Sequence, residues 1–199
     1  MHSHDLLCPT RLLSRDEVLS RPSPIPKSPG VYAWYFREIP PGVPINACVG
    51  CHSHTLLYVG ISPSAPPTNG KRPSTQSLWH RLRYHFRGNA EGSTLRLTLG
   101  CLLADQIGLQ LRRVGSGKRM TFGPGESALS EWMARNAFVA FHVCERPWEL
   151  ESQLLHSVPL PLNLDQNRNH AFHATLSETR KAAKLLARNL DILQYSRTF

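Results

Sequence analysis

The chain has little that would carry it into or across a membrane. No stretch of its 199 residues approaches the roughly 18 apolar residues that a membrane-spanning helix needs. Its first residues, MHSHDLLCPTRLLSRDE, contain no uninterrupted apolar segment of the kind found in export signals. Both absences argue against a membrane protein and favour a cytoplasmic one.

Cysteine is scarce, and its distribution excludes a disulfide framework. The chain has 5 cysteines, an odd and scattered set without an export signal, so buried free thiols are expected. Cys48 and Cys51 lie near His52 and His54, and all four are competent zinc ligands. Structural zinc sites usually draw on two separated pairs, and adjacent Cys51 and His52 seldom share one metal. The pattern therefore favours a loop with incidental thiols over a structural zinc.

Acidic residues are also few relative to basic ones. Lys and Arg number 23 against 14 Asp and Glu, which gives a formal net charge of +9. A basic excess of this size favours a polyanionic partner, and nucleic acid is the leading candidate. The composition is too apolar, at 41%, for a disordered chain, and the length suits one domain.

Three regions follow from the distribution of proline, glycine and apolar residues. Residues 1–28 form a Pro-rich basic arm, residues 29–168 a folded domain, and residues 169–199 a basic helical extension. Two insertions are expected in the domain, near residues 38–55 and 90–136. The segments GVYAWYF from Gly30 and LLYVGI from Leu56 are rich in β-branched and aromatic residues, so they predict two paired strands.

Helical spacing of apolar residues predicts several helices around these strands. The expected segments are a helix at residues 77–87, one at 94–107 ended by Gly108, one at about 126–137, a strand at 138–145, and helices at 147–158 and 177–193. Residues 109–122 suggest a further hairpin. The resulting fold class is α/β in the α+β sense, with a small mixed or antiparallel sheet flanked by helices.

The order of five short motifs resembles that of the GIY-YIG nuclease family. Gly30-Val-Tyr32 begins the first strand and Tyr58-Val-Gly60 ends the second, while the helix that follows reads Leu78-Trp-His-Arg81-Leu-Arg-Tyr-His85-Phe. Glu151 then lies on a late helix, and Pro161-Leu-Asn163 closes the pattern. Each motif alone is weak, but all five occur in the right order between residues 30 and 163.

The resemblance implies a metal-dependent endonuclease, and the residue chemistry agrees with it. Glu151 offers a hard oxygen ligand for one Mg²⁺ or Mn²⁺ ion, and Arg81 offers a planar set of donors to a phosphate. His85, one turn beyond Arg81, is a credible proton acceptor that works with Tyr32 or Tyr58. Which of these groups is the base stays open at this point.

The remaining site residues are assigned to orientation and to binding. Asn163 is expected to orient the site by hydrogen bonds, and Gly30 and Gly60 are expected to allow close backbone approach. A basic strip around the site is expected to bind nucleic acid, with DNA favoured over RNA, through Lys71, Arg72, Arg83 and Arg87. The oligomeric state stays open.

The spacing of the motifs departs from the usual pattern of the family, and two other glutamates need to be distinguished from Glu151. The two tyrosines are separated by 25 residues, where the family usually has a short turn, so the hairpin carries an insertion. Glu149 precedes Glu151 by two positions and could be confused with it, whereas Glu126 at the start of a helix suits the helix dipole. The alternative function is a nucleic-acid-binding module of the same fold that does not cut.

Overall fold

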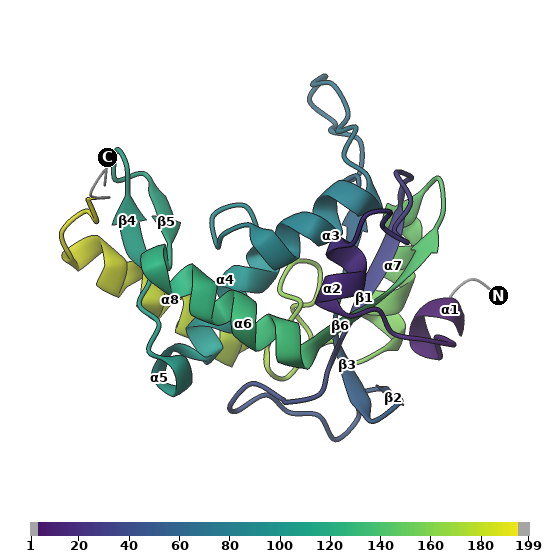
Figure 1. Ribbon diagram of the computed structural model, residues 1–199, viewed down its shortest axis with the longest axis horizontal. Helices are drawn as coiled ribbons and strands as arrows, with labels where there is room; N and C mark the ends of the chain where they lie inside the picture. The colour runs from purple at the N-terminus through teal and green to yellow at the C-terminus, as the bar shows by residue number, and fades with distance from the viewer. Residues whose placement is uncertain (1–3, 195–199) are drawn as a thin grey trace.

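A four-stranded antiparallel sheet forms the centre of the computed structural model, which describes residues 4–194 (Figure 1). In chain order the elements are α1 (His4–Leu7), α2 (Arg15–Leu19), β1 (Gly30–Phe36), β2 (Gly50–Cys51), β3 (His54–Ser62), α3 (Leu78–Arg87), α4 (Thr94–Leu102), α5 (Ala104–Ile107), β4 (Arg112–Val114), β5 (Arg119–Thr121), η1 (Gly123–Gly125), α6 (Glu126–Asn136), β6 (Ala137–Val143), α7 (Pro147–Ser157) and α8 (His173–Asn189). The sheet has the order β2-β3-β1-β6, and β4 and β5 form a separate hairpin.

Strand β1 lies inside the sheet and is buried along its whole length. Because successive side chains of a strand point to opposite faces, its residues divide between two apolar clusters. Tyr32, Trp34 and Phe36 belong to one cluster, and Val31 and Tyr35 belong to the other. Both faces of the sheet are therefore covered, which explains why the whole segment GVYAWYF is apolar or aromatic.

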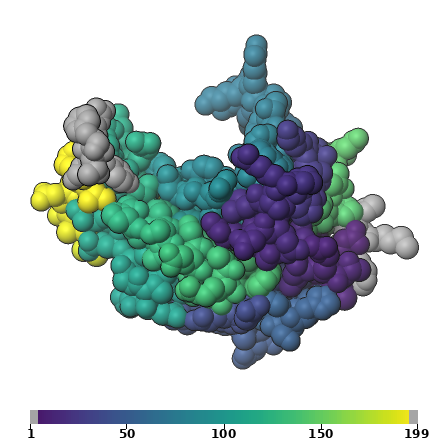
Figure 2. Space-filling model, in the orientation of Figure 1, coloured from purple at the N-terminus to yellow at the C-terminus, as the bar shows by residue number. Residues whose placement is uncertain are grey.

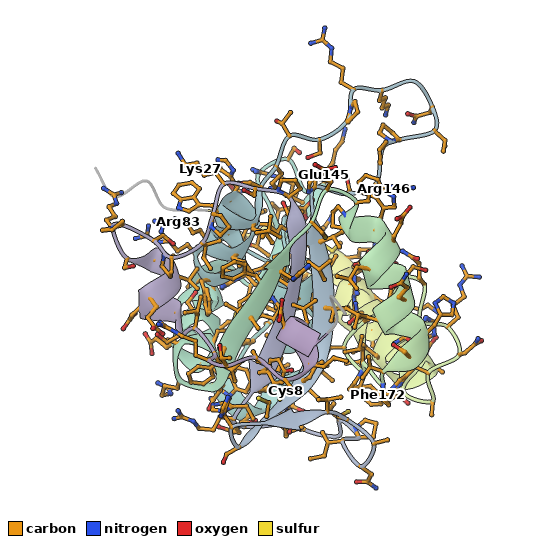
Figure 3. All side chains as sticks on the ribbon, turned by 90° about the vertical axis from the view of Figure 1, so that its right-hand side faces the viewer. Cys8, Lys27, Arg83, Glu145, Arg146 and Phe172 are labelled. Atoms are coloured by element: carbon orange, nitrogen blue, oxygen red, sulfur yellow. The ribbon has the colours of Figure 1, made fainter. Side chains whose placement is uncertain are left out.

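Helices cover both faces of this sheet, as Figures 1 and 3 show. Leu78, Leu82 and Phe86 of α3 pack into the cluster on one face. Leu154 and Leu155 of α7 pack into the cluster on the other. The predicted arrangement, two antiparallel strands held between the helices near residues 77–87 and 147–157, is confirmed.

The long insertion between the two tyrosines is the tip of the β1–β3 hairpin. It contains the short strand β2, whose Gly50 pairs with Thr55 at the start of β3. Strand β3 accordingly begins at His54, two residues before the predicted Leu56. The insertion extends the edge of the sheet and leaves the β1–β3 pairing from Gly30 to Trp34 intact.

Helices α4, α6 and α8 and the β4–β5 hairpin form the other end of the molecule (Figure 1). The single helix predicted at residues 94–107 is two helices that meet at Leu103, and Gly108 ends the second in the left-handed conformation. The final helix begins at His173 and ends at Asn189, four residues earlier at each end than predicted. Buried Leu176 accounts for the earlier start, because it extends the packed face.

The N-terminal segment packs onto the domain. Leu6 and Val18 are fully buried, and Leu13 pairs with Val139 at the edge of the sheet. The Tyr35 hydroxyl also donates a hydrogen bond of 2.6 Å to the carbonyl of Leu6. The Pro-rich residues 20–29 contain no helix or strand, as expected from their prolines. Across residues 4–194, no helix has the length and apolar character needed to cross a membrane.

A buried ion pair joins α4 to α6 and is also bonded to α3. Arg96 on α4 is fully buried and donates two hydrogen bonds to the Glu126 carboxylate, of 3.0 and 2.6 Å, and another to the His85 carbonyl. Glu126 also accepts the backbone N–H groups of Ala90 and Phe122. Its place is therefore structural, in addition to the helix-dipole role expected from the sequence.

We expect Glu126→Ala to lower the free energy of unfolding by about 3–5 kcal/mol, because it leaves the buried Arg96 guanidinium without its counter-charge. Urea unfolding followed by circular dichroism measures this loss. Glu131, exposed on the same helix, is the control, and Glu131→Ala should change stability by less than about 0.5 kcal/mol. Equal effects of the two substitutions would contradict the role assigned to the buried pair.

Candidate active site

The β1–β3 pairing places Tyr32 beside Gly60 and Trp34 beside Tyr58. A Cβ atom on Gly60 would lie 2.5 Å from the Tyr32 hydroxyl and 2.7 Å from its ring. Only glycine therefore leaves room for the Tyr32 ring across the strand pair. Gly30 is equally confined, since a Cβ atom there would lie 2.7 Å from Leu78 and would collide with the backbone of β6.

Helix α3 brings Arg81 and His85 to the Tyr32 hydroxyl. His85 Nε2 lies 2.9 Å from Tyr32 Oη, and Arg81 Nε donates to the same oxygen at 3.3 Å. The two side chains are one helical turn apart, which is why both reach one atom. Arg81 Nη1 is held by the carbonyl of Gly92 at 2.9 Å. Arg81 and His85, which the sequence placed one turn apart, therefore both contact the hydroxyl of Tyr32.

His85 is fully buried, and its second ring nitrogen is also bonded. Nδ1 lies 2.7 Å from Ser93 Oγ, and that oxygen also accepts the backbone N–H of Arg96 as the N-cap of α4. Burial, together with the nearby charges of Arg81 and Arg96, lowers the pKa of His85 well below its ordinary value. The imidazole is consequently neutral in the substrate-free protein, with Ser93 and Tyr32 fixing its orientation.

Burial also keeps Tyr32 protonated. The Tyr32 side chain is 1% exposed, and desolvation is the main cause that raises its pKa above the ordinary value, followed by the nearby Tyr58. The charge of Arg81 acts in the opposite direction. Tyr32 is thus a neutral phenol at rest, and it becomes a proton acceptor only if its own proton moves on.

These groups open onto one cleft of about 460 Å³. Its walls come from β1, β3, the 62–77 loop, α3, α4, α7, the segment after α7, and α8. The side chains relevant to chemistry on these walls are Tyr32, Tyr58, Arg81, Thr94, Glu151, Asn163, Asp165 and Arg180. Five of the six residues predicted to be catalytic line the cleft, and His85 lies behind Tyr32.

Glu151 enters the cleft from α7, and its surroundings shift its pKa. Burial, and secondarily the neighbouring carboxylate of Asp165, together raise this pKa to about 7. Two carboxylates in a partly buried cleft are an unfavourable arrangement unless a cation joins them. Hard oxygen donors of this kind suit Mg²⁺ or Mn²⁺, which take one or two carboxylates and complete their shell with water and phosphate. The residues therefore fit the expected cation.

Asn163 holds the segment after α7 against β3. Its Oδ1 accepts the backbone N–H of Val59 at 3.0 Å, and its Nδ2 donates to the Val59 carbonyl at 2.8 Å. Val59 lies between Tyr58 and Gly60, so this clamp fixes the part of β3 that borders the cleft. Its amide is occupied by the backbone, which leaves Asn163 a positioning role.

The four residues predicted to bind nucleic acid are not brought together. Lys71 and Arg72 lie on the exposed 62–77 loop, other residues of which line the cleft. Arg87 is exposed at the end of α3 and outside the cleft lining. Arg83 is 9% exposed, donates to the Val18 carbonyl at 3.1 Å and stacks on Trp79.

Arg83 therefore binds the N-terminal segment of its own chain, on the face of the sheet away from α7, where Figure 3 labels it near Lys27. This differs from the expectation that it faces nucleic acid. The physical reason is that α2 packs on α3 and presents the carbonyl of Val18 near its end, which accepts from Arg83 and from the Ser23 hydroxyl. Sequence periodicity alone could not place α2 there.

Four residues that line the cleft or hydrogen-bond to its side chains were not among the predicted site residues. They are Ser93 behind His85, Thr94 at 3.4 Å from the Tyr58 hydroxyl, Asp165 beside Glu151, and Arg180 on α8. Ser93 carried a usable signal, because a serine before a predicted helix at residue 94 is a typical N-cap. The other three are brought to the cleft by long-range packing.

The cysteines of the insertion have ordinary contacts. Cys48 and Cys51 donate to backbone carbonyls of Pro44 and Pro9. Nowhere in residues 4–194 do three or more His, Cys, Asp or Glu side chains gather closely enough to hold a metal ion. The cleft pair of Glu151 and Asp165 is accordingly a site that would share its cation with water and substrate.

Comparison with known protein families matches residues 30–182 to the GIY-YIG catalytic domain. The chain belongs to the GIY-YIG family. Members of this family are generally endonucleases, so cleavage of nucleic acid is the family-level activity. No curated protein and no solved structure matches the chain. The predicted resemblance is confirmed, and the matched GIY-YIG domain contains every residue of the cleft described above.

We expect Glu151→Gln to stabilise the metal-free GIY-YIG domain at pH 8 and to leave it unchanged near pH 4. The folded-state pKa of about 7 lies above the ordinary 4.5, so the folded protein binds the proton more tightly than the unfolded chain does. Stability is then lost as pH rises from 4.5 to 7, by on the order of 2 kcal/mol for a partly buried group.

Thermal unfolding in EDTA across this pH range measures the effect. The parent should lose stability relative to Glu151→Gln as pH rises, and the two curves should converge at low pH. A constant difference at every pH would show that Glu151 is not perturbed by its surroundings.

Proposed function

We propose that this protein is a metal-dependent endonuclease that hydrolyses phosphodiester bonds of nucleic acid, with DNA as its substrate. The observation that carries the proposal is the Tyr32 hydroxyl, bonded to both Arg81 and His85 and facing a cleft that also contains Glu151. Hydrolysis of a phosphodiester needs an activated water, charge stabilisation at the phosphoryl oxygens and a stabilised leaving group. The cleft offers a residue for each requirement.

Glu151, with Asp165 beside it, would hold one Mg²⁺ or Mn²⁺ ion, which supplies positive charge to the phosphoryl and leaving oxygens when bound. Both carboxylates lie in the cleft lining, and the raised pKa of Glu151 reflects first its burial and then the nearby charge of Asp165. The basic excess of the chain and the family match both support a nucleic-acid substrate, and we propose DNA as that substrate.

Tyr32 and His85 form the proton path for the attacking water. As the water oxygen forms its bond to phosphorus, its proton passes to Tyr32 Oη and the phenol proton passes to His85 Nε2. The ester P–O bond breaks, and the leaving oxygen takes a proton from solvent. The distance of 2.9 Å between Oη and Nε2 is within the range for direct transfer.

The neutral resting state of His85 agrees with this path. Its pKa is lowered by burial first and then by the charges of Arg81 and Arg96. A bound phosphate beside Arg81 brings negative charge that offsets this cation and raises the proton affinity of the imidazole. The relay is therefore activated by the substrate itself, and Ser93 keeps the ring aligned at 2.7 Å.

The guanidinium nitrogens of Arg81 have two roles, because some bond within the protein and one is left for the substrate. Nε and Nη1 are bonded to Tyr32 and to the Gly92 carbonyl. Across residues 4–194, Nη2 has no hydrogen-bond acceptor, and Arg81 lines the cleft. This nitrogen can donate to a phosphoryl oxygen whose charge grows during attack.

We expect Glu151→Gln to lower the rate of plasmid cleavage in Mg²⁺ by at least about a thousandfold, while DNA binding is kept. Glutamine keeps the shape of the side chain but removes the charge that holds a hard cation. Plasmid nicking and filter binding, measured on the same preparations, give the two readouts.

The control is Glu149→Gln, two residues away. Glu149 forms an exposed ion pair with Arg146 and is outside the cleft lining, so this variant should cut at the parental rate. Cleavage by Glu151→Gln at the parental rate would overturn the catalytic assignment. A parent protein that binds DNA but never cuts it would instead identify a non-catalytic nucleic-acid-binding module.

A further inference from the structure

Helix α8 carries basic residues at regular spacing along one face. Arg180, Lys184 and Arg188 recur every four residues, so they lie on the same side of the helix. Successive members are about 6 Å apart along its axis. The row begins at the catalytic cleft, because Arg180 is one of the residues that line it.

The row runs along α4 away from the cleft. Thr94 and Thr98 of α4 line the cleft, and Cys101 follows one turn later on the same helix. Burial raises the pKa of the Cys101 thiol to about 11, and the charges of Arg180 and Lys184 partly oppose this rise. Both cations therefore lie close to the face of α4 that leaves the cleft.

These cations are not neutralised by the protein. Between residues 4 and 194, no carboxylate forms an ion pair with Arg180, Lys184 or Arg188. Lys181, one position along the helix, is paired with Glu178 at 2.6 Å. A row of unpaired cations that starts inside a cleft attracts a chain of anions rather than a single one.

Two further arginines hold the helix in place. Arg112 and Arg113 donate to the carbonyls of Asp191 and Leu190, just beyond the end of α8, at 3.0 and 2.7 Å. These bonds attach the end of the helix to β4. One nitrogen of each guanidinium therefore bonds to the backbone at the end of α8, whereas Arg180, Lys184 and Arg188 form no ion pair with the protein within residues 4–194.

We infer that Arg180, Lys184 and Arg188 bind successive phosphates of the nucleic-acid strand that leads away from the scissile bond. The inference rests on the proposed function, since it takes the cleft as the place of cleavage. The exposed 62–77 loop, with Lys71 and Arg72, forms another wall of the same cleft. Figure 2 shows the surface hollowed between this projecting loop and the end of the molecule that contains α8.

The test compares two triple variants that remove the same number of charges. The first is Arg180→Gln, Lys184→Gln and Arg188→Gln combined. The control combines Arg11→Gln, Arg15→Gln and Lys181→Gln, whose parent side chains are paired with Glu17, Asp16 and Glu178. Equal loss of net charge means that a difference between the variants reports position alone.

The measurement is fluorescence anisotropy of a labelled DNA duplex in EDTA, over a series of salt concentrations. Each phosphate contact contributes about 0.9 to the steepness with which log affinity falls against log salt concentration. The slope of the first variant should therefore be shallower than that of the parent by about 2.7, and the slope of the control should equal that of the parent. Between roughly 50 and 200 mM salt, the affinity of the parent for the duplex should therefore fall about 40-fold more than the affinity of the first variant. If the triple variant does not fold, each single variant should lower the slope by about 0.9.

A parental slope in the first variant, or an equal loss in the control, overturns the assignment of the row. Binding in EDTA requires no cleavage, so this result is independent of the proposed chemistry. If the two variants change the slope as expected but the parent does not cut plasmid in Mg²⁺, the proposed function is contradicted and the binding row is supported. A parent that binds no DNA overturns both.

Discussion

The hydrogen bond between Tyr32 and His85 joins the central strand to the helix that covers it, and the rest of the site depends on this contact. Tyr32 can reach α3 only because Gly60 leaves space for its ring across the strand pair. The ring of His85 is oriented toward the Tyr32 hydroxyl because its Nδ1 is bonded to the hydroxyl of Ser93, the N-cap of α4. The same turn of α3 then places Arg81 on the shared hydroxyl. One buried contact therefore positions both the helix α3 on the sheet and the side chains of the site.

Burial favours the neutral forms of Tyr32, Glu151 and His85 in the absence of substrate. It raises the pKa of Tyr32, raises that of Glu151 to about 7, and lowers that of His85. A ligand of opposite charge offsets this cost of charging a buried group. A cation beside Glu151 and a phosphate beside Arg81 each favour the ionised form of a neighbouring residue. In this account the substrate and the cation complete the electrostatics of the cleft, and the relay becomes effective only when both are bound.

The sequence predicted the elements and motifs that depend on local pattern. The paired strands and the helix at residues 77–87 follow from local pattern, whereas Tyr32, Arg81 and Glu151 were selected through the resemblance to the GIY-YIG family, which is confirmed. Asp165 and Arg180 were missed because long-range packing alone brings them to the cleft. Arg83 was assigned to nucleic acid, but the chain folds its own N-terminal segment onto it and uses it for the Val18 carbonyl. Local patterns predict which face of a helix is polar, but they do not predict what will cover that face.

The most direct test of the central claim is the rate of plasmid cleavage by Tyr32→Phe. Phenylalanine keeps the ring that packs beside Trp34 and His85 and removes only the hydroxyl on which the relay depends. The account predicts a loss of at least about a hundredfold in cleavage rate, with Mn²⁺ binding retained because the Glu151 carboxylate is untouched. A Tyr32→Phe protein that folds, binds Mn²⁺ and cuts plasmid at the parental rate would contradict the account.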